Sequence, residues 1–201
     1  MASPLSLSNR SRRRRLTLLA SAGVSVVVLT VAISLLTSST ASTFTARVVA
    51  GVPFSPGEAD GMIPAAAPLT VENDTHPAMA RLDPDLLDAL RAAQAAAASD
   101  GIVFDVTSGW RSAAYQRWLL DDAIRTSGSE ETARAYVATP EQSSHVTGRA
   151  VDIGSLDAQL WIIENGRDWG LCQTYANERW HFEKATDAGG ECPEPHRDAR
   201  G

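Results

Sequence analysis

The hydrophobic positions of this chain form one long apolar run near the N-terminus and several shorter, spaced patterns after residue 70. Residues 16–37 carry no charge, and a run of roughly 20 apolar residues is long enough to span a bilayer. Arg10 and Arg12–Arg15 precede it, and such a basic cluster stays on the cytoplasmic side of a membrane. The pattern predicts a cytoplasmic basic segment (1–15), a transmembrane anchor or signal sequence (16–37) and an extracytoplasmic remainder.

Residues 16–37 have two interpretations. A cleaved signal peptide has an apolar core of about 7–15 residues followed by small residues, which Ser39-Thr40-Ala41 would supply. The length of the run favours an uncleaved anchor. Either way, the part of the chain that does the work is expected outside the cytoplasm, at the membrane or secreted after cleavage near Ala41.

Prolines interrupt the chain between residues 38 and 69, among Gly, Ala and Ser and without a sustained helical or strand period. This composition is typical of a linker. We expect a globular domain over residues 70–192. The polar residues 193–201 are expected to form a tail that frays beyond Cys192.

Helical and strand periods alternate within the expected domain. Asp83-Pro84 is a typical helix start, with a capping carboxylate and a proline in the first turn, and Gly101 is a typical end. Residues 170–173 are interpreted as a turn before the last strand. The patterns predict helices at about 84–100, 113–126, 130–138 and 156–165, and strands at about 102–107, 150–153 and 178–183.

Charge narrows the choice of partners. The whole chain has a formal net charge of -6, but its five N-terminal arginines conceal a strongly acidic remainder. An acidic domain is a poor nucleic-acid binder, because phosphate contacts depend on Lys and Arg. Nucleic acid is therefore excluded as a partner.

The chain has two cysteines, Cys172 and Cys192. In an extracytoplasmic protein, a disulfide is the simplest use of an isolated pair. It would close a loop of about 20 residues and contribute about 3 kcal/mol in the chain-entropy model. Zinc ligation by the two thiols is the alternative, but they lack the Cys-x-x-Cys spacing of structural zinc sites.

Two histidines and a carboxylate suggest a metal site. His145, Asp152 and His181 could supply the three protein ligands of a catalytic zinc ion, with a fourth position left for water. Glu178, three residues before His181, could act as general base on that water. The alternative is a buried structural His181 and an ordinary surface His145.

The spacing of Glu178 and His181 constrains the local structure. In a regular strand these side chains would point to opposite faces, because side chains alternate. A helix would put both on one face, but the sequence Trp180-His181-Phe182 is typical of a strand. We therefore expect a strand that starts with a turn or bulge around Glu178.

Three sequence blocks between about residues 80 and 184 resemble the VanY-type D-alanyl-D-alanine carboxypeptidases, zinc peptidases that trim bacterial cell-wall peptides. The blocks are Ser108-Gly109-Trp110-Arg111-Ser112 with Gln116; Ser143-x-His145-x-x-Gly148-x-Ala150-x-Asp152; and Glu178-x-Trp180-His181. The chain departs from the family pattern at Trp110, where Tyr is usual, and at Arg179, where Pro is common. Neither departure removes a ligand.

The resemblance implies roles for these residues. His145, Asp152 and His181 would bind Zn²⁺, and Glu178 would be catalytic base and acid. Arg111 would pair with the substrate or stabilise the developing oxyanion. Gln116, Ser143 and Trp110 are the remaining candidates for substrate binding.

The resemblance also implies an α+β fold, in which helices pack on a small antiparallel sheet with a zinc cleft, as in the D-Ala-D-Ala carboxypeptidase and hedgehog proteins. The expected activity is removal of the terminal D-alanine from peptidoglycan stem peptides, at the outer face of a bacterial membrane. An endopeptidase cutting within the stem, for example at an L-alanyl-D-glutamate bond, would use the same ligands. A non-catalytic, zinc-containing wall-binding module is the third possibility, although binding alone would not need Glu178.

Overall fold

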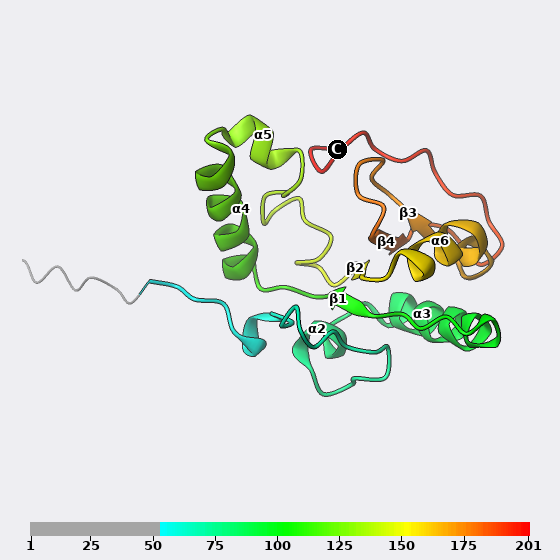
Figure 1. Cartoon of the computed structure of the whole chain (residues 1–201). Helices are drawn as coiled ribbons and strands as arrows, with labels where there is room; N and C mark the ends of the chain where they lie inside the picture. Colours follow the sequence, from blue (N-terminus) through cyan, green and yellow to red (C-terminus); the bar gives the residue numbers. More distant parts are fainter. Residues whose placement is uncertain (1–52) are drawn as a thin grey trace, which may run out of the picture. The chain divides into compact units, whose positions relative to one another are not determined.

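The computed structural model describes residues 53–201 (Figure 1). The expected anchor or signal sequence at residues 16–37 lies outside this range. Within residues 53–201, no helix combines the length and apolar character needed to cross a bilayer.

The described residues form an α+β unit, as expected from the resemblance. Its helices are α2 (Pro77–Ala80), α3 (Pro84–Ala97), α4 (Ala113–Ser127), α5 (Glu130–Arg134) and α6 (Leu156–Asn165), with short 3-10 helices η1 (Glu58–Asp60), η2 (Ala98–Asp100) and η3 (Gly166–Trp169). Its strands are β1 (Val106–Ser108), β2 (Ala150–Ile153), β3 (Leu171–Gln173) and β4 (His181–Lys184).

The longer helices begin where polar side chains cap them. Asp83 accepts a hydrogen bond from the backbone N–H of Asp85 at the start of α3, and Ser112 accepts one from Tyr115 at the start of α4. These caps satisfy N–H groups that have no partner within the helix. The helix expected over residues 130–138 is shorter than predicted, because α5 ends at Arg134.

The four strands form one antiparallel sheet in the order β1-β2-β4-β3. Strand β3 was not predicted, since residues 171–173 were interpreted as a turn. Only pairing with β4 makes this three-residue segment a strand. β1 is shorter than the expected strand at 102–107, because the side chain of Gln94 bonds Ile102 O and Phe104 N in place of a neighbouring strand.

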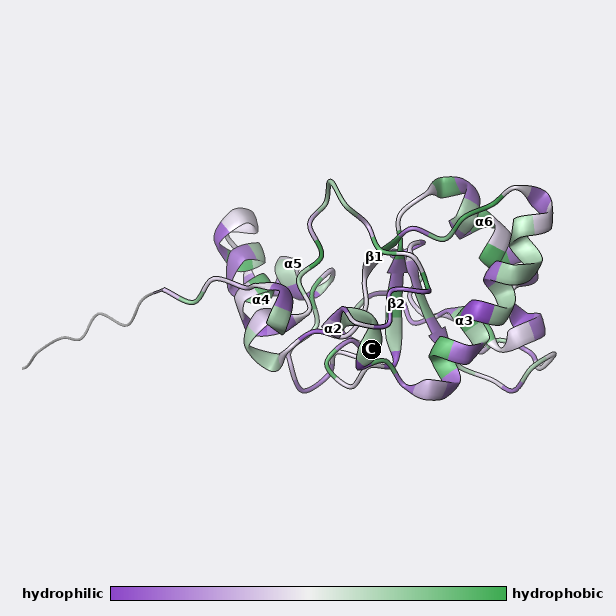
Figure 2. Cartoon of the chain, turned by 90° about the horizontal axis from the view of Figure 1, so that it is seen from below, coloured by the Kyte–Doolittle hydropathy of each residue, from purple (hydrophilic) through white to green (hydrophobic). Residues whose placement is uncertain are grey.

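The hydrophobic core lies between the sheet and helices α3 and α6. Figure 2 shows these two helices at one end of the unit, and α4 and α5 pack on each other at the other end. One face of α3 is buried, and Phe104 and Phe182 are the largest fully buried side chains among residues 53–201. The core therefore supports the sheet, and the sheet carries the polar residues described below.

The segments flanking residues 70–192 also contact this unit. Leu69 pairs with Val106 through two backbone hydrogen bonds, and Asp60 bonds both the backbone and the hydroxyl of Ser112. At the other end, Asp198 and Ala199 are buried. The expectation of a frayed tail beyond Cys192 is therefore wrong for these residues, because backbone pairing holds them.

Candidate metal centre

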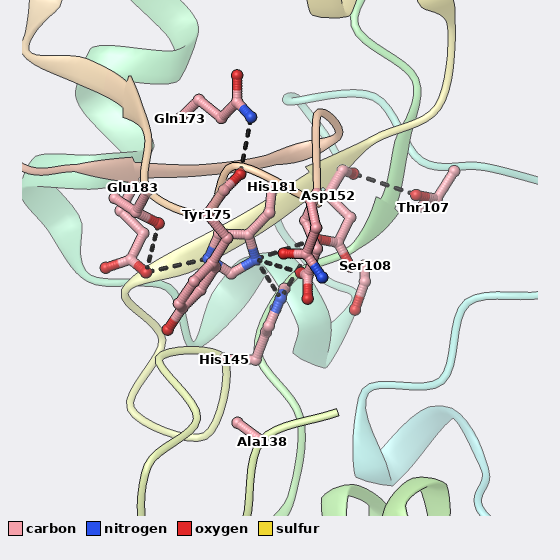
Figure 3. Close-up of polar contacts among 12 residues, drawn as sticks. Thr107, Ser108, Ala138, His145, Asp152, Gln173, Tyr175, His181 and Glu183 are labelled. Atoms are coloured by element: carbon pink, nitrogen blue, oxygen red, sulfur yellow. Dashed lines mark hydrogen bonds and ion pairs between the residues drawn. The ribbon is translucent and has the colours of Figure 1, made fainter. Parts of the chain in front are cut away.

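The sheet brings Asp152 and His181 together. Asp152 on β2 lies directly opposite His181 on β4, so their side chains project from the same face. His145 reaches the same point from the loop before β2. Asp152 Oδ1 lies 3.3 Å from both His145 Nε2 and His181 Nδ1, and these two nitrogens are 3.2 Å apart (Figure 3). The three predicted ligands therefore converge on one point.

Hydrogen bonds on the far side of each imidazole set which nitrogen is free. His145 Nδ1 lies 2.8 Å from the carbonyl oxygen of Gly109, and His181 Nε2 lies 3.0 Å from Glu183 Oε1. A carbonyl or carboxylate oxygen only accepts, so these nitrogens carry the protons. The lone pairs of His145 Nε2 and His181 Nδ1 then face the common point, as ligating histidines require.

The residues present fit a metal ion. With both imidazoles neutral, two nitrogen lone pairs meet Asp152 Oδ1, which is buried and accepts no hydrogen bond. Three acceptors at such short distances need a cation or a proton between them. Two imidazoles and one carboxylate are a ligand set of catalytic zinc sites.

In the absence of a metal, a proton occupies the position between the two histidines and Asp152. Burial alone would lower the pKa of His181, but hydrogen bonds with Asp152 and Glu183 outweigh it and raise this pKa to about 9. Burial alone would raise the pKa of Asp152, but the two histidines and Arg111 outweigh it and hold this pKa well below its usual range. Burial lowers the pKa of His145. Metal and proton therefore compete for His181.

Arg111 is hydrogen-bonded to Asp152 Oδ2, the carboxylate oxygen that does not face the histidines. Its Nη2 donates to Asp152 Oδ2 at 2.9 Å, its Nε to Ser108 Oγ at 2.8 Å, and its Nη1 to Gln116 Oε1 at 3.0 Å. The expected role was a contact with substrate or oxyanion. In this structure the guanidinium, which also lines the cleft, is bonded within the protein and orients Asp152 so that Oδ1 faces the histidines.

Glu178 lies in the turn before β4, which begins at His181. This confirms the expected irregular start of the strand. Glu178 Oε2 is 3.9 Å from His181 Nδ1, and Oε1 is buried without a hydrogen-bond partner. Burial is the main cause that raises the pKa of Glu178 to about 7. A carboxyl group near neutral pKa, free of other partners and beside a metal site, can exchange protons with bound water.

The other predicted site residues differ in whether they line the cleft. Ser143 lines the cleft, and Gln116 lines it while its amide donates to Ala138 O. Trp110 does not line the cleft; it packs on the core, with Arg81 over its ring. The cleft residues are Arg111, Gln116, Tyr136, Val137, Ala138, Ser143, Ser144, His145, Asp152, Tyr175, Glu178, Trp180, His181 and Ala199.

Sequence reasoning missed Glu183. It is two residues after His181 in β4, so strand alternation puts both side chains on one face. That spacing could have identified it. Ala199 was also missed, and nothing in its local sequence indicates a cleft residue.

An α+β unit with a buried group of two histidines and one aspartate, and a buried glutamate beside it, is an arrangement that mononuclear zinc hydrolases use. The VanY family model, described as D-alanyl-D-alanine carboxypeptidase, matches residues 79–186. This range covers more than half of the chain and includes every predicted metal ligand. The chain belongs to the VanY family, which confirms the resemblance seen in its motifs.

Individual relatives match over part of their length. A D-alanyl-D-alanine carboxypeptidase of Enterococcus faecalis is 28% identical over 127 residues, which is 51% of this chain and 46% of that protein. YodJ of Bacillus subtilis is 38% identical over 110 residues, 48% of this chain and 40% of that protein. The chain thus spans less than half the length of these curated relatives.

Among solved structures, the vancomycin-resistance D,D-pentapeptidase VanY, in complex with Zn(II), is similar with a TM-score of 0.49 and 23% identity. The match covers 64% of this chain and 86% of that one.

Proposed function

We propose that this protein is a zinc-dependent D-alanyl-D-alanine carboxypeptidase that removes the terminal D-alanine from peptidoglycan stem peptides. The observation that carries the proposal is the convergence of His145 Nε2, His181 Nδ1 and the unpartnered Asp152 Oδ1 beside the free carboxyl group of Glu178. Membership of the VanY family supports the choice of reaction and substrate.

The mechanism assigns a distinct task to each of these residues. His145, Asp152 and His181 would hold Zn²⁺, which supplies Lewis acidity and lowers the pKa of a bound water toward neutrality. Glu178 accepts a proton from the attacking water and later donates it to the leaving amine. A pKa of about 7 suits a group that must do both at neutral pH.

Surrounding residues keep the ligands in place. Gly109 O and Glu183 fix the tautomers of the two histidines, and Arg111 fixes the orientation of Asp152. A ligand set held by such contacts needs little reorganisation when the metal binds or the reaction proceeds.

We also propose an extracytoplasmic location, on or outside the cell membrane. The basic segment followed by the apolar run at residues 16–37 supports this orientation. The disulfide between Cys172 and Cys192 supports it independently, because disulfides persist in oxidising compartments.

The test is a product analysis on the fragment from residue 43 onward. A stem pentapeptide ending in D-Ala-D-Ala is incubated with zinc-loaded protein, with and without chelator, and the products are analysed by mass. We expect zinc-dependent loss of one alanine. Glu178→Gln should reduce the rate by about 10²–10⁴-fold while zinc content stays at one per chain.

Glu164→Gln is the matched control, since Glu164 is an exposed glutamate of α6. It should keep full activity. An internal cut would instead assign an endopeptidase, and zinc-loaded protein that cleaves neither pentapeptide nor intact peptidoglycan would support the binding module.

A further inference from the structure

The C-terminal residues 196–200 reach the candidate metal cleft. The disulfide ties Cys192 to Cys172 on β3, and the chain then runs from the sheet toward α5 (Figure 1). Ala199 is buried and lines the same cleft as His145 and Glu178. A segment expected to fray is therefore part of the wall of the site.

One side of this segment pairs with the loop that carries Glu178. The backbone N–H of His196 donates to Thr174 O at 2.9 Å, and His196 O accepts from Ala176 N at 2.8 Å. The rings of His196 and Tyr175 also pack, with centroids 6.0 Å apart. The segment thus lies against the residues just before Glu178.

The other side of the segment contacts α5 and the residue after it. Ala199 N donates to Ala135 O, and Asn177 Nδ2 donates to the same oxygen at 2.8 Å. Arg200 pairs with Asp198 and lies 4.0 Å from Glu131. Residues 196–200 therefore bridge the Glu178 loop and α5, and Ala199 lines the cleft between them.

The side of the cleft that this segment lines matters for the chemistry. If Glu178 donates a proton to the leaving amine, that nitrogen must come within hydrogen-bond reach of its carboxyl group. The residue that leaves, and anything attached after it, must then lie on the Glu178 side of the metal ligands. Residues 196–200 lie on that side, because His196 pairs with the backbone of Thr174 and Ala176 just before Glu178.

We propose that residues 196–200 are a specificity wall that leaves room for one residue beyond the scissile bond, making the site a carboxypeptidase and excluding substrates that continue past that residue. The inference rests on the proposed function and deepens it, because the metal ligands alone would serve an endopeptidase equally well. Ala199 is the wall residue that faces the substrate.

The first experiment shortens the wall. A chain ending at His196 keeps the disulfide and the backbone pairing of His196, and lacks residues 197–201, which include Ala199. Its substrates are a stem pentapeptide and the same peptide extended by two residues at its C-terminus. Unshortened protein should cleave the D-Ala-D-Ala bond of the extended peptide at least tenfold less efficiently, by kcat/KM, than that of the pentapeptide. Shortened protein should bring the two values within about threefold.

The second experiment adds bulk to the wall, and does not depend on the shortened chain folding. Ala199→Trp should lower kcat/KM for the pentapeptide at least tenfold, chiefly through KM, with zinc content unchanged. Ala95→Trp is the matched control, because Ala95 is an exposed alanine of α3 outside the cleft lining and outside the wall. It should behave like the unsubstituted protein.

Peptide binding separates failure of the wall from failure of the proposed function. Calorimetry in the Glu178→Gln background, with zinc bound, should give at least tenfold weaker binding of the extended peptide, and the shortened chain should remove this difference. Discrimination in binding without hydrolysis by the unsubstituted protein would keep the wall and overturn the carboxypeptidase. Equal binding and cleavage of both peptides by the unsubstituted protein, or an Ala199→Trp variant no worse than Ala95→Trp, would overturn the wall.

Discussion

At the scale of single residues, Glu183 is a side chain that lies behind the candidate metal ligand His181 and would influence how that ligand binds. Its Oε1 accepts from His181 Nε2 at 3.0 Å and from Thr174 Oγ1 at 3.1 Å. A carboxylate behind a histidine fixes the tautomer and makes the opposite nitrogen more basic. The metal affinity of His181 should therefore depend on the charge of Glu183.

Glu183→Gln should weaken zinc binding by about 10–100-fold, because the amide cannot donate electron density to His181 as a carboxylate does. Competition with a chromogenic chelator measures the affinity directly. Thr174→Val, which removes one hydrogen bond to the same oxygen, should have a smaller effect, and the exposed Glu164→Gln should have none. Unchanged zinc affinity in Glu183→Gln would refute this role.

Protonation of His181 makes the stability of the metal-free protein depend on pH. Its folded pKa of about 9 lies above the ordinary value of 6.5. A raised histidine pKa contributes stability that is fully present below the unfolded pKa and is lost as pH rises through the folded pKa. The loss should therefore occur between about pH 6.5 and 9, and be on the order of 3 kcal/mol.

Urea unfolding of chelator-treated protein at several pH values tests this expectation. Zinc-loaded protein should keep a nearly constant stability over the same range, because zinc displaces the His181 proton and its tighter binding at higher pH offsets the stability lost by the metal-free form. Parallel pH profiles for the two forms would contradict competition between proton and metal.

At the scale of structural elements, the loop before β2 depends on Gly148. This residue has φ of 74°, and a Cβ there would lie 2.3 Å from the backbone oxygen of Arg81. Its own carbonyl accepts from Asp83 N at the start of α3. The glycine thus lets the loop that carries His145 lie directly against the chain entering α3.

Gly148→Ala should lower the free energy of unfolding by about 2 kcal/mol or more, through left-handed strain and backbone collision together. Gly128 is a close control, since its φ is 70° and a Cβ would meet nothing within 4 Å. Gly128→Ala should cost only the strain, about 1 kcal/mol. Denaturant titrations of both variants separate the two effects, and equal losses would show that the close approach is unimportant.

The disulfide acts on a second element, the loop that contains both Glu178 and His181. Cys172 on β3 is bonded to Cys192, 20 residues later, as expected from the isolated cysteine pair. Replacing both cysteines by serine should lower the free energy of unfolding by about 3 kcal/mol, since a closed loop restricts the unfolded chain.

Denaturant unfolding of the double variant, compared with reduced unsubstituted protein, tests this expectation. The two should agree, and zinc should still bind, because the antiparallel pairing of β3, β4 and β2 holds His181 without the disulfide. Loss of zinc binding in the double variant would show that the covalent link itself positions the ligands.

At the scale of the whole molecule, the site is assembled from segments that are far apart in the sequence. Gly109 and Arg111 follow β1, His145 precedes β2, Asp152 is on β2 and His181 is on β4. The antiparallel sheet brings these segments to one face, and Ala199, far away in the sequence, lines the cleft that they form. Ligand geometry and cleft shape therefore depend on the fold as a unit.

Much of the fold and of the candidate site could be predicted from local sequence. Helices α3, α4 and α6 start and end close to their predicted bounds, because capping residues and apolar spacing act over a few positions. The two cysteines pair as expected. Residue type, spacing and the family motifs predicted His145, Asp152 and His181 as metal ligands, and the structure brings these three side chains together. The turn before β4 followed from the alternation of side chains in a strand.

Other features were decided only by tertiary contacts. β3 is a strand only because β4 lies beside it, and Arg111 faces Asp152 only because β1 and β2 pair. The tail around Ala199 has no local pattern that would order it, and its partners on α5 and before β4 are distant in sequence. Local sequence thus determined the helices and the chemistry of the ligands, because caps, periodicity and ligand type are short-range properties. The role of Arg111 and the lining of the cleft by Ala199 required the folded chain, since they depend on contacts between residues tens of positions apart.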